Sequence, residues 1–83
     1  MTGTVDRIMR HGVLAKIDGT PEIGDLFQVY RVVDGVEVIV GTGYIRKPHG
    51  PGMFKLQPPE TETGERGGQF PDVLEGDLVR KVV

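Results

Sequence analysis

The chain contains no cysteine and no serine among its 83 residues. Without cysteine, neither a disulfide nor a thiolate metal site can stabilise the protein, and the two commonest nucleophiles of covalent catalysis are missing. The only imidazoles belong to His11 and His49, and no H-x-H or H-x-x-x-H spacing places two of them on one metal ion. We therefore expect no catalytic residue, no bound metal and no cofactor, which means a protein that is not an enzyme.

Long apolar runs and a strong excess of one charge are absent as well. No stretch approaches the roughly 18 apolar residues that would cross a bilayer, and the first residues show no hydrophobic region of a signal peptide. Ten Lys and Arg against twelve Asp and Glu give a net charge of −2. We expect no membrane insertion, and any nucleic-acid contact would depend on a local basic patch.

The sequence is rich in glycine, with 13 residues, and in short runs where apolar and polar residues alternate. Alternation with a period of two is typical of half-buried β-strands, and a chain of this length forms one domain around a single core. The sequence thus predicts one all-β domain over residues 1–83. The expected strands cover about 2–10, 13–17, 26–33, 36–47, 53–57 and 77–82.

Two glycine-containing motifs indicate how these strands are arranged. Asp34-Gly35 is typical of a two-residue type I′ turn and predicts an antiparallel hairpin between the strands on either side. Gly41 and Gly43 lie within the second strand of that hairpin, where glycine usually marks a bulge or a sharp bend. Five or six short strands with such a bend favour a small closed or half-closed barrel, because a sandwich needs about seven strands.

A repeated turn motif and a long loop complete the predicted layout. Gly24-Asp25 and Gly76-Asp77 each precede a strand, and we expect two equivalent turns in which the Asp carboxylate accepts backbone N–H groups. Residues 58–72 are polar and Gly-rich, which predicts a long mobile loop before the last strand. The apolar residues expected to fill the barrel are Val13, Ile17, Phe27, Val29, Val38, Val40, Phe54, Leu56 and Val79.

The order of these motifs resembles a known group of domains. Gly3-Thr4-Val5, the strand Gly24-Asp25-Leu26-Phe27-Gln28-Val29-Tyr30-Arg31 and the closing Gly76-Asp77-Leu78-Val79 are similar to motifs of SH3-like barrels at the C-terminal ends of bacterial envelope proteins. Examples are the C-terminal domain of flagellar assembly protein T and the barrels that follow LysM modules. The resemblance implies an SH3-like barrel in a larger bacterial protein, located in the periplasm or cell envelope, with an accessory or assembly role. Residues 58–72 depart from that pattern, so no partner surface is carried over.

Residues 44–55 concentrate the side chains best suited to binding. The candidate contact residues are Tyr44, Arg46, Lys47, His49 and Phe54. Aromatic side chains and arginine are frequent in protein contacts, and the same set would suit phosphate contacts and base stacking on a nucleic-acid strand. A purely structural role is the alternative to both kinds of binding. Tyr44 and Phe54 alternate with their neighbours as core residues of adjacent strands do, and Arg46 and Lys47 would then form a solvated strand end.

The predicted hairpin of residues 26–40 offers a second surface, because it is apolar on both of its faces. Side chains alternate across a strand, so a barrel interior can bury only half of them. We expect a protein partner, a neighbouring domain of the parent protein or a second copy of the chain to cover the rest. The sequence therefore predicts a non-enzymatic accessory or assembly barrel that mediates protein or cell-wall contacts, with a nucleic-acid-binding barrel as the alternative.

Overall fold

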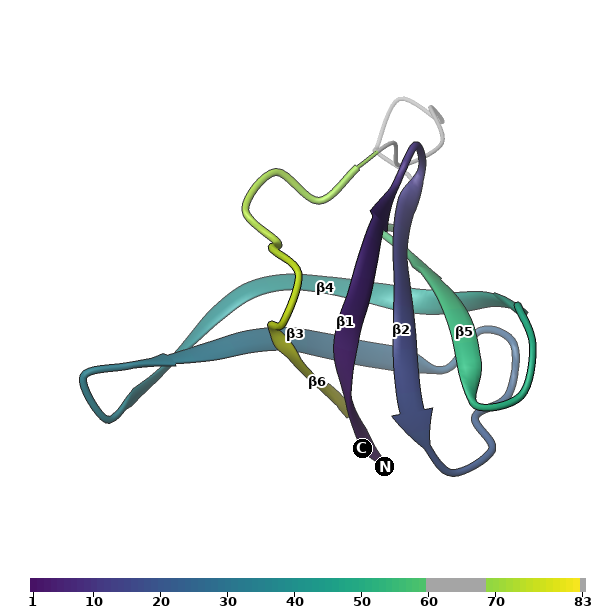
Figure 1. Ribbon diagram of the computed structural model, residues 1–83, viewed down its shortest axis with the longest axis horizontal. Helices are drawn as coiled ribbons and strands as arrows, with labels where there is room; N and C mark the ends of the chain where they lie inside the picture. The colour runs from purple at the N-terminus through teal and green to yellow at the C-terminus, as the bar shows by residue number, and fades with distance from the viewer. Residues whose placement is uncertain (60–68, 83) are drawn as a thin grey trace.

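Six antiparallel strands close into one barrel in the computed structural model, which describes residues 1–59 and 69–82 (Figure 1). Around the barrel the strands follow the order β1-β2-β5-β4-β3-β6, and β6 then pairs with β1. The predicted all-β barrel is confirmed. The strands are β1 (Thr2–Met9), β2 (Gly12–Asp18), β3 (Leu26–Val33), β4 (Val36–Pro48), β5 (Met53–Gln57) and β6 (Leu78–Lys81).

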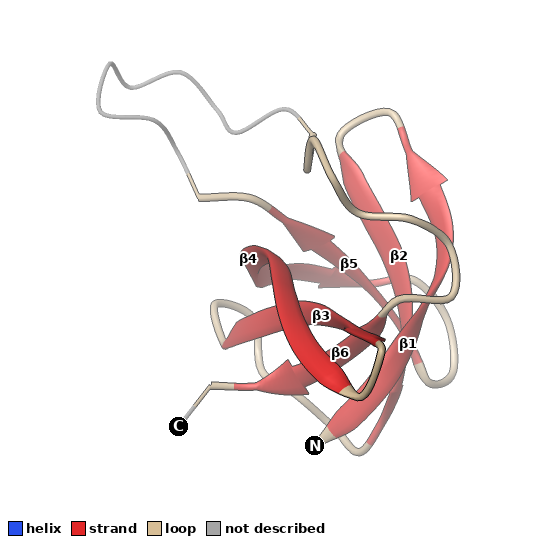
Figure 2. Cartoon of the chain, turned by 90° about the vertical axis from the view of Figure 1, so that its left-hand side faces the viewer, coloured by secondary structure: helices blue, strands red, loops and turns tan. Residues whose placement is uncertain are grey.

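The six strands wrap around one interior (Figure 2). Apolar side chains from all six strands and from the segment before β6 fill this interior. The largest members that are fully buried are Phe27, Ile45 and Leu56. The core consists of Val5, Val13, Ala15, Ile17, Phe27, Val29, Ile45, Phe54, Leu56, Phe70, Val73 and Val79, with Val40 packed against it.

A bulge in β4 corrects one part of the predicted core. Tyr30 pairs with Ile39 but Val29 pairs with Gly41, so Val40 is an extra residue on β4. An extra residue reverses which alternate side chains face the interior. Between the bulge and Ile45, the residues of β4 that face the barrel interior are therefore odd-numbered, and Ile45 is a core residue. Val38 was expected in the core, but it lies beyond the barrel and is 42% exposed.

Phe70 explains the two glycines of β4. A Cβ atom at Gly41 would lie 2.8 Å from the Phe70 ring, and one at Gly43 would lie 2.5 Å from that ring and from the carbonyl oxygen of Gln57. The bend predicted from these glycines is thus also the place where an aromatic ring packs directly on the backbone. Phe70 falls within the predicted loop of 58–72, yet it is buried. Residues 60–68 of that loop lie outside the described residues.

The two Gly-Asp motifs form equivalent turns, as the sequence predicts. Gly24 and Gly76 have φ angles of +93° and +89°, a region that favours glycine. Asp25 accepts a hydrogen bond from the Glu22 backbone N–H at 2.9 Å, and Asp77 accepts one from Leu74 at 2.8 Å. Each turn is thus closed by a hydrogen bond between its own residues and leads directly into a strand of the barrel.

Candidate functional site

The hairpin of β3 and β4 projects beyond the barrel, at the left of Figure 1. We call residues 31–39 the arm. Its tip is the predicted turn, in which Asp34 and Gly35 have φ angles of +51° and +78°, as a type I′ turn requires. Val32 pairs with Glu37 and Val33 with Val36, so the hairpin register runs to the turn without interruption.

Neither outer edge of the arm is paired with another strand among the described residues. β6 pairs with β3 only over Phe27–Tyr30, and β5 pairs with β4 only from Tyr44 onward. Backbone groups on the outer edges of the arm are therefore available for pairing with a further strand, which proteins usually prevent with lysine, proline or a covering segment. The arm contains neither lysine nor proline.

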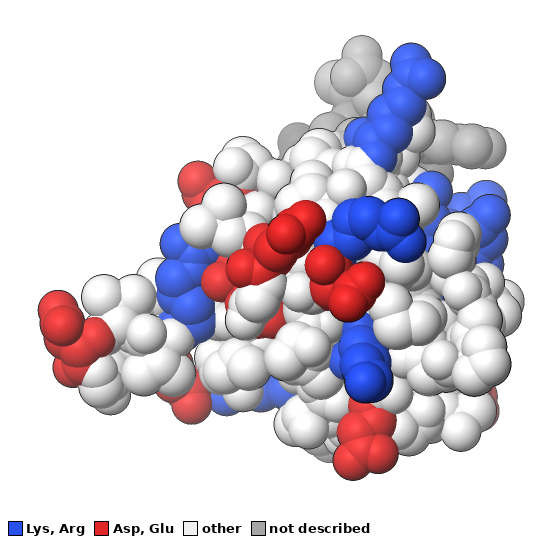
Figure 3. Space-filling model, viewed as in Figure 1, with Lys and Arg blue, Asp and Glu red and all other residues white. Residues whose placement is uncertain are grey.

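Apolar side chains are exposed on both faces of the arm. Val33, Val36 and Val38 share the face that continues the barrel interior, whereas Val32 and Ile39 lie on the other face. Their exposed fractions run from 42% for Val38 to 62% for Val36. Figure 3 shows this part of the molecule as a mostly uncharged projection with acidic atoms at its tip. Five exposed aliphatic side chains on one short hairpin form an apolar surface of the kind that marks contact sites.

Charged contacts fix the base of the arm on the face that continues the barrel interior. Arg31 donates from Nε to Oδ1 of Asp77 at 3.0 Å and from Nη2 to Oδ2 at 2.8 Å, and Nη2 also donates to the carbonyl of Asp72. The hydrogen bonds to Asp77 raise the pKa of Arg31 above its ordinary value. Because the paired hydrogen bonds fix the plane of the guanidinium group, they also fix the arm relative to the turn before β6.

A second set of contacts lies on the opposite face. The guanidinium of Arg80 stacks over the Tyr30 ring at 4.3 Å from the ring centroid. It donates to Gln28 Oε1 at 3.2 Å and to Glu37 Oε2 at 2.7 Å. Glu37 belongs to the arm and Arg80 to β6, so this pair ties the arm to the barrel from the other side. Both faces of the base are thus fixed, while the apolar residues beyond it are exposed.

One of the residues predicted to bind in 44–55 does not lie on the surface. Phe54 is only 8% exposed and packs in the core, as its structural interpretation predicted. Tyr44 is half-buried, and its hydroxyl lies 3.4 Å from Gln57 Oε1. Arg46, Lys47 and His49 are exposed, and Lys47 pairs across the sheet with Lys55. The structure thus leaves the polar members of the set on the surface and removes Phe54 from it.

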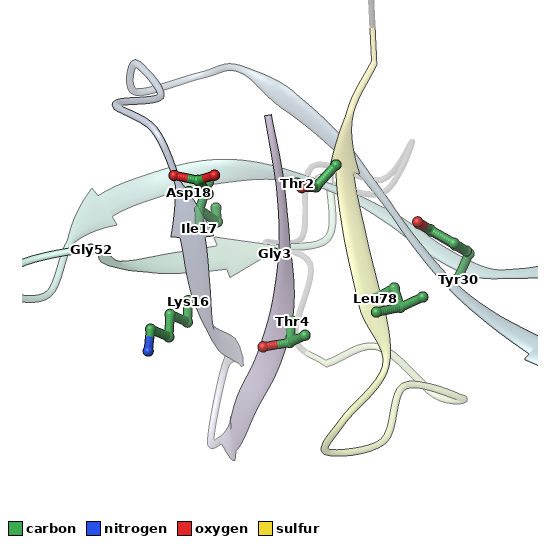
Figure 4. A pocket seen from close by; sticks show the side chains of 9 residues that line it. All are labelled: Thr2, Gly3, Thr4, Lys16, Ile17, Asp18, Tyr30, Gly52 and Leu78. Atoms are coloured by element: carbon green, nitrogen blue, oxygen red, sulfur yellow. The ribbon is translucent and has the colours of Figure 1, made fainter.

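An open groove of about 660 Å³ lies on the outer face of the barrel, between β1, β2, β3 and β6 (Figure 4). No sequence pattern predicts this groove, because its residues meet only through the register of four strands. Its charged members are Lys16 and Asp18, and the described residues contain no group of three or more side chains suited to a metal ion. The full lining is Thr2, Gly3, Thr4, Lys16, Ile17, Asp18, Tyr30, Gly52 and Leu78.

Comparisons with known proteins give no relative from which a site can be transferred. No family model, no curated protein and no solved structure matches the chain. Within residues 1–59 and 69–82 there is no helix of the length and apolar character needed to cross a membrane.

Proposed function

We propose that this protein is a non-enzymatic assembly module that binds another protein through the arm. The observation that carries the proposal is the exposure of five aliphatic side chains on both faces of a hairpin whose outer edges are unpaired among the described residues. Each square ångström of apolar surface removed from water contributes about 25 cal/mol. Covering the arm would therefore contribute substantially to binding.

The shape of the arm indicates the kind of partner. A flat surface could cover only one face of a projecting hairpin, so Val36 and Ile39, which lie on opposite faces, would not both be buried. A partner with an apolar cleft would bury both faces and would also pair with the exposed edges by strand addition. The fixed base of the arm favours such binding, because little conformational freedom is lost when a rigid element docks.

The resemblance to SH3-like barrels of bacterial envelope proteins supports the same role. Those domains act as accessory parts of larger assemblies, and the corresponding proposal for this chain is an assembly role in the bacterial periplasm or cell envelope. The partner would be another protein of that assembly or a neighbouring domain of the same parent protein.

Site-specific photocrosslinking in the source cells tests the proposal. A benzophenone amino acid replaces Val36 in the arm, and the control carries it at Ile23, which is 68% exposed in a turn outside the arm. We expect one adduct of defined mass from position 36 and none from position 23. The adduct should be lost when Val33→Thr and Ile39→Thr are added, because these changes make both faces polar.

The other outcomes are equally informative. Adducts of the same pattern from both positions, or none from position 36, would contradict the proposed role of the arm. An adduct at twice the mass of the chain would identify the partner as a second copy, and sedimentation of the purified protein would then show a dimer that the double Thr variant lacks.

A further inference from the structure

Two lysines face each other across neighbouring strands on the outer surface of the barrel. Lys47 of β4 is paired in register with Lys55 of β5. Directly opposed residues of two antiparallel strands have Cβ atoms about 5 Å apart, and like charges at such positions destabilise a sheet. This pair therefore works against the fold in which it lies.

The same row of the sheet contains a third cation from a distant part of the sequence. Lys55 pairs with Leu14 of β2, and Leu14 pairs with Arg7 of β1. The row Arg7-Leu14-Lys55-Lys47 thus crosses four strands, a span of roughly 14 Å at the usual strand spacing. Arg46, the extra residue of a second bulge in β4, lies next to Lys47 in the chain. We call Arg7, Arg46, Lys47 and Lys55 the basic row.

No acidic side chain neutralises the basic row within residues 1–59 and 69–82. The ion pairs there are Arg31–Asp77, Arg80–Glu37 and Lys81–Asp25, and their cations belong to β3 and β6. Asp6 precedes Arg7 in the chain but forms no ion pair with it. Figure 3 shows basic atoms at the right-hand edge of the molecule, whereas basic and acidic atoms lie side by side at its front. The protein is acidic as a whole, so the basic row is a local feature.

Leu14 is the apolar member of this row and lies between Arg7 and Lys55 in register. It lies on the outer face, is only 2% exposed, and does not belong to the core cluster. Its neighbours in register are Arg7 and Lys55, whose long aliphatic stems are suited to covering an apolar side chain while the charged groups stay in water. Two cations thus flank one buried apolar side chain in this row.

We propose that the basic row binds the phosphate backbone of a single-stranded nucleic acid. Like charges that no ion pair compensates among the described residues are typical of functional sites, where local stability is lost for binding. A row of cations across a barrel suits successive phosphates, and Tyr44 lies on the outer face of β4 beside it. A half-buried aromatic ring next to a basic row is the combination that single-strand binders use for stacking.

Fluorescence anisotropy with a labelled 15-nucleotide oligothymidine tests this site at 20 mM and 150 mM NaCl. Lys55→Glu reverses the central charge of the basic row. Arg10→Glu makes the same charge change at an exposed position outside it and serves as the control. We expect Lys55→Glu to weaken binding at least about tenfold and Arg10→Glu to weaken it less than about threefold, and we expect wild-type affinity to fall steeply with salt.

Thermal unfolding gives an independent readout of the same variants. In Lys55→Glu the new carboxylate would lie opposite Lys47 and near Arg7, so its melting temperature at low salt should exceed that of the wild type. A gain in stability together with a loss of binding is the expected signature of a binding site. Absence of oligonucleotide binding at 20 mM NaCl, or equal losses in both variants, would overturn the proposal.

Competitors identify the ligand chemistry. Inorganic polyphosphate should compete with oligothymidine, and Tyr44→Leu should weaken oligothymidine binding without weakening polyphosphate binding. Stronger binding of heparin or polyglutamate than of oligothymidine would reject a nucleic acid in favour of a glycan or an acidic protein. The double variant Val33→Thr and Ile39→Thr should bind oligothymidine like the wild type, because it changes only the arm. The nucleic-acid site and the protein-binding role of the arm can therefore be rejected independently of each other.

Discussion

Arg31 and Asp77 connect the arm to the turn that precedes β6 through two parallel hydrogen bonds of 3.0 and 2.8 Å. The residues are 46 positions apart in the sequence. Asp77 Oδ2 also accepts the backbone N–H of Leu74 at 2.8 Å, so one carboxylate satisfies both its own turn and the base of the arm. The carboxylate that closes a turn by local chemistry thereby also fixes the direction in which the arm projects.

Replacing this carboxylate should destabilise the whole protein. Asp77→Ala removes the acceptor for Leu74 and for two donors of Arg31, and we expect a loss of about 2 kcal/mol in the free energy of unfolding. For a domain of this size the melting temperature would fall by roughly 10 °C. Calorimetry or urea unfolding measures the change.

The equivalent turn supplies the matched control. Asp25→Ala removes one backbone hydrogen bond and an ion pair with Lys81 at 3.4 Å, but Asp25 is more exposed than Asp77. Its effect should be clearly smaller than that of Asp77→Ala. Equal effects of the two changes would mean that Arg31 adds nothing to the stability of the second turn.

Asp25 should make stability depend on pH in the acid range. The backbone N–H of Glu22 donates to its carboxylate and Lys81 lies nearby, and these hold the pKa of Asp25 below its ordinary value of 3.8. A lowered pKa in the folded state stabilises the protein above the unfolded pKa, and this contribution is lost as the pH falls below about 4. NMR titration of Asp25 should show the lowered pKa. In Asp25→Asn, stability should fall less between pH 5 and pH 2 than in the wild type, and an unchanged slope would contradict this assignment.

Gly43 should tolerate no side chain. A Cβ atom there would meet the carbonyl oxygen of Gln57 and the ring of Phe70, each at 2.5 Å. We expect Gly43→Ala to lower the free energy of unfolding by about 2 to 3 kcal/mol.

Gly41→Ala tests the packing of Phe70 by itself, because the Cβ at that position would meet only side chains. Phe70→Leu should relieve part of that clash, so the Gly41→Ala and Phe70→Leu changes should cost less together than the sum of their separate effects. Strict additivity, measured by urea unfolding of all four proteins, would show that Phe70 does not pack on Gly41.

The apolar residues of the arm should contribute little to folding. Val33→Thr and Ile39→Thr change side chains that are 47% and 46% exposed, and we expect the free energy of unfolding to change by less than about 0.5 kcal/mol for each. Val29→Thr makes the same kind of change at a fully buried position and should cost at least about 1.5 kcal/mol. A large loss from the arm variants would mean that the arm supports the fold.

The sequence by itself determined the strands and the turns between them. Alternating apolar residues located the strands to within a few positions, because a half-buried strand requires that alternation. Asp34-Gly35 and the two Gly-Asp motifs specified their turns, because positive φ angles and short-range carboxylate hydrogen bonds depend on residues that are close in the chain. Local chemistry was enough for each of these features.

Only the tertiary structure decided which residues meet. The bulge at Val40 placed Ile45 in the core, and an alternation pattern does not contain the position of an extra residue. Val38 is exposed because the hairpin extends beyond the barrel at that position. Phe70 is buried because Gly41 and Gly43 leave space for its ring, which no pattern around Phe70 reveals. The basic row likewise depends on the register of four strands. Register between distant segments is set by how the whole barrel closes, and so the surfaces proposed for binding became visible only in the folded chain.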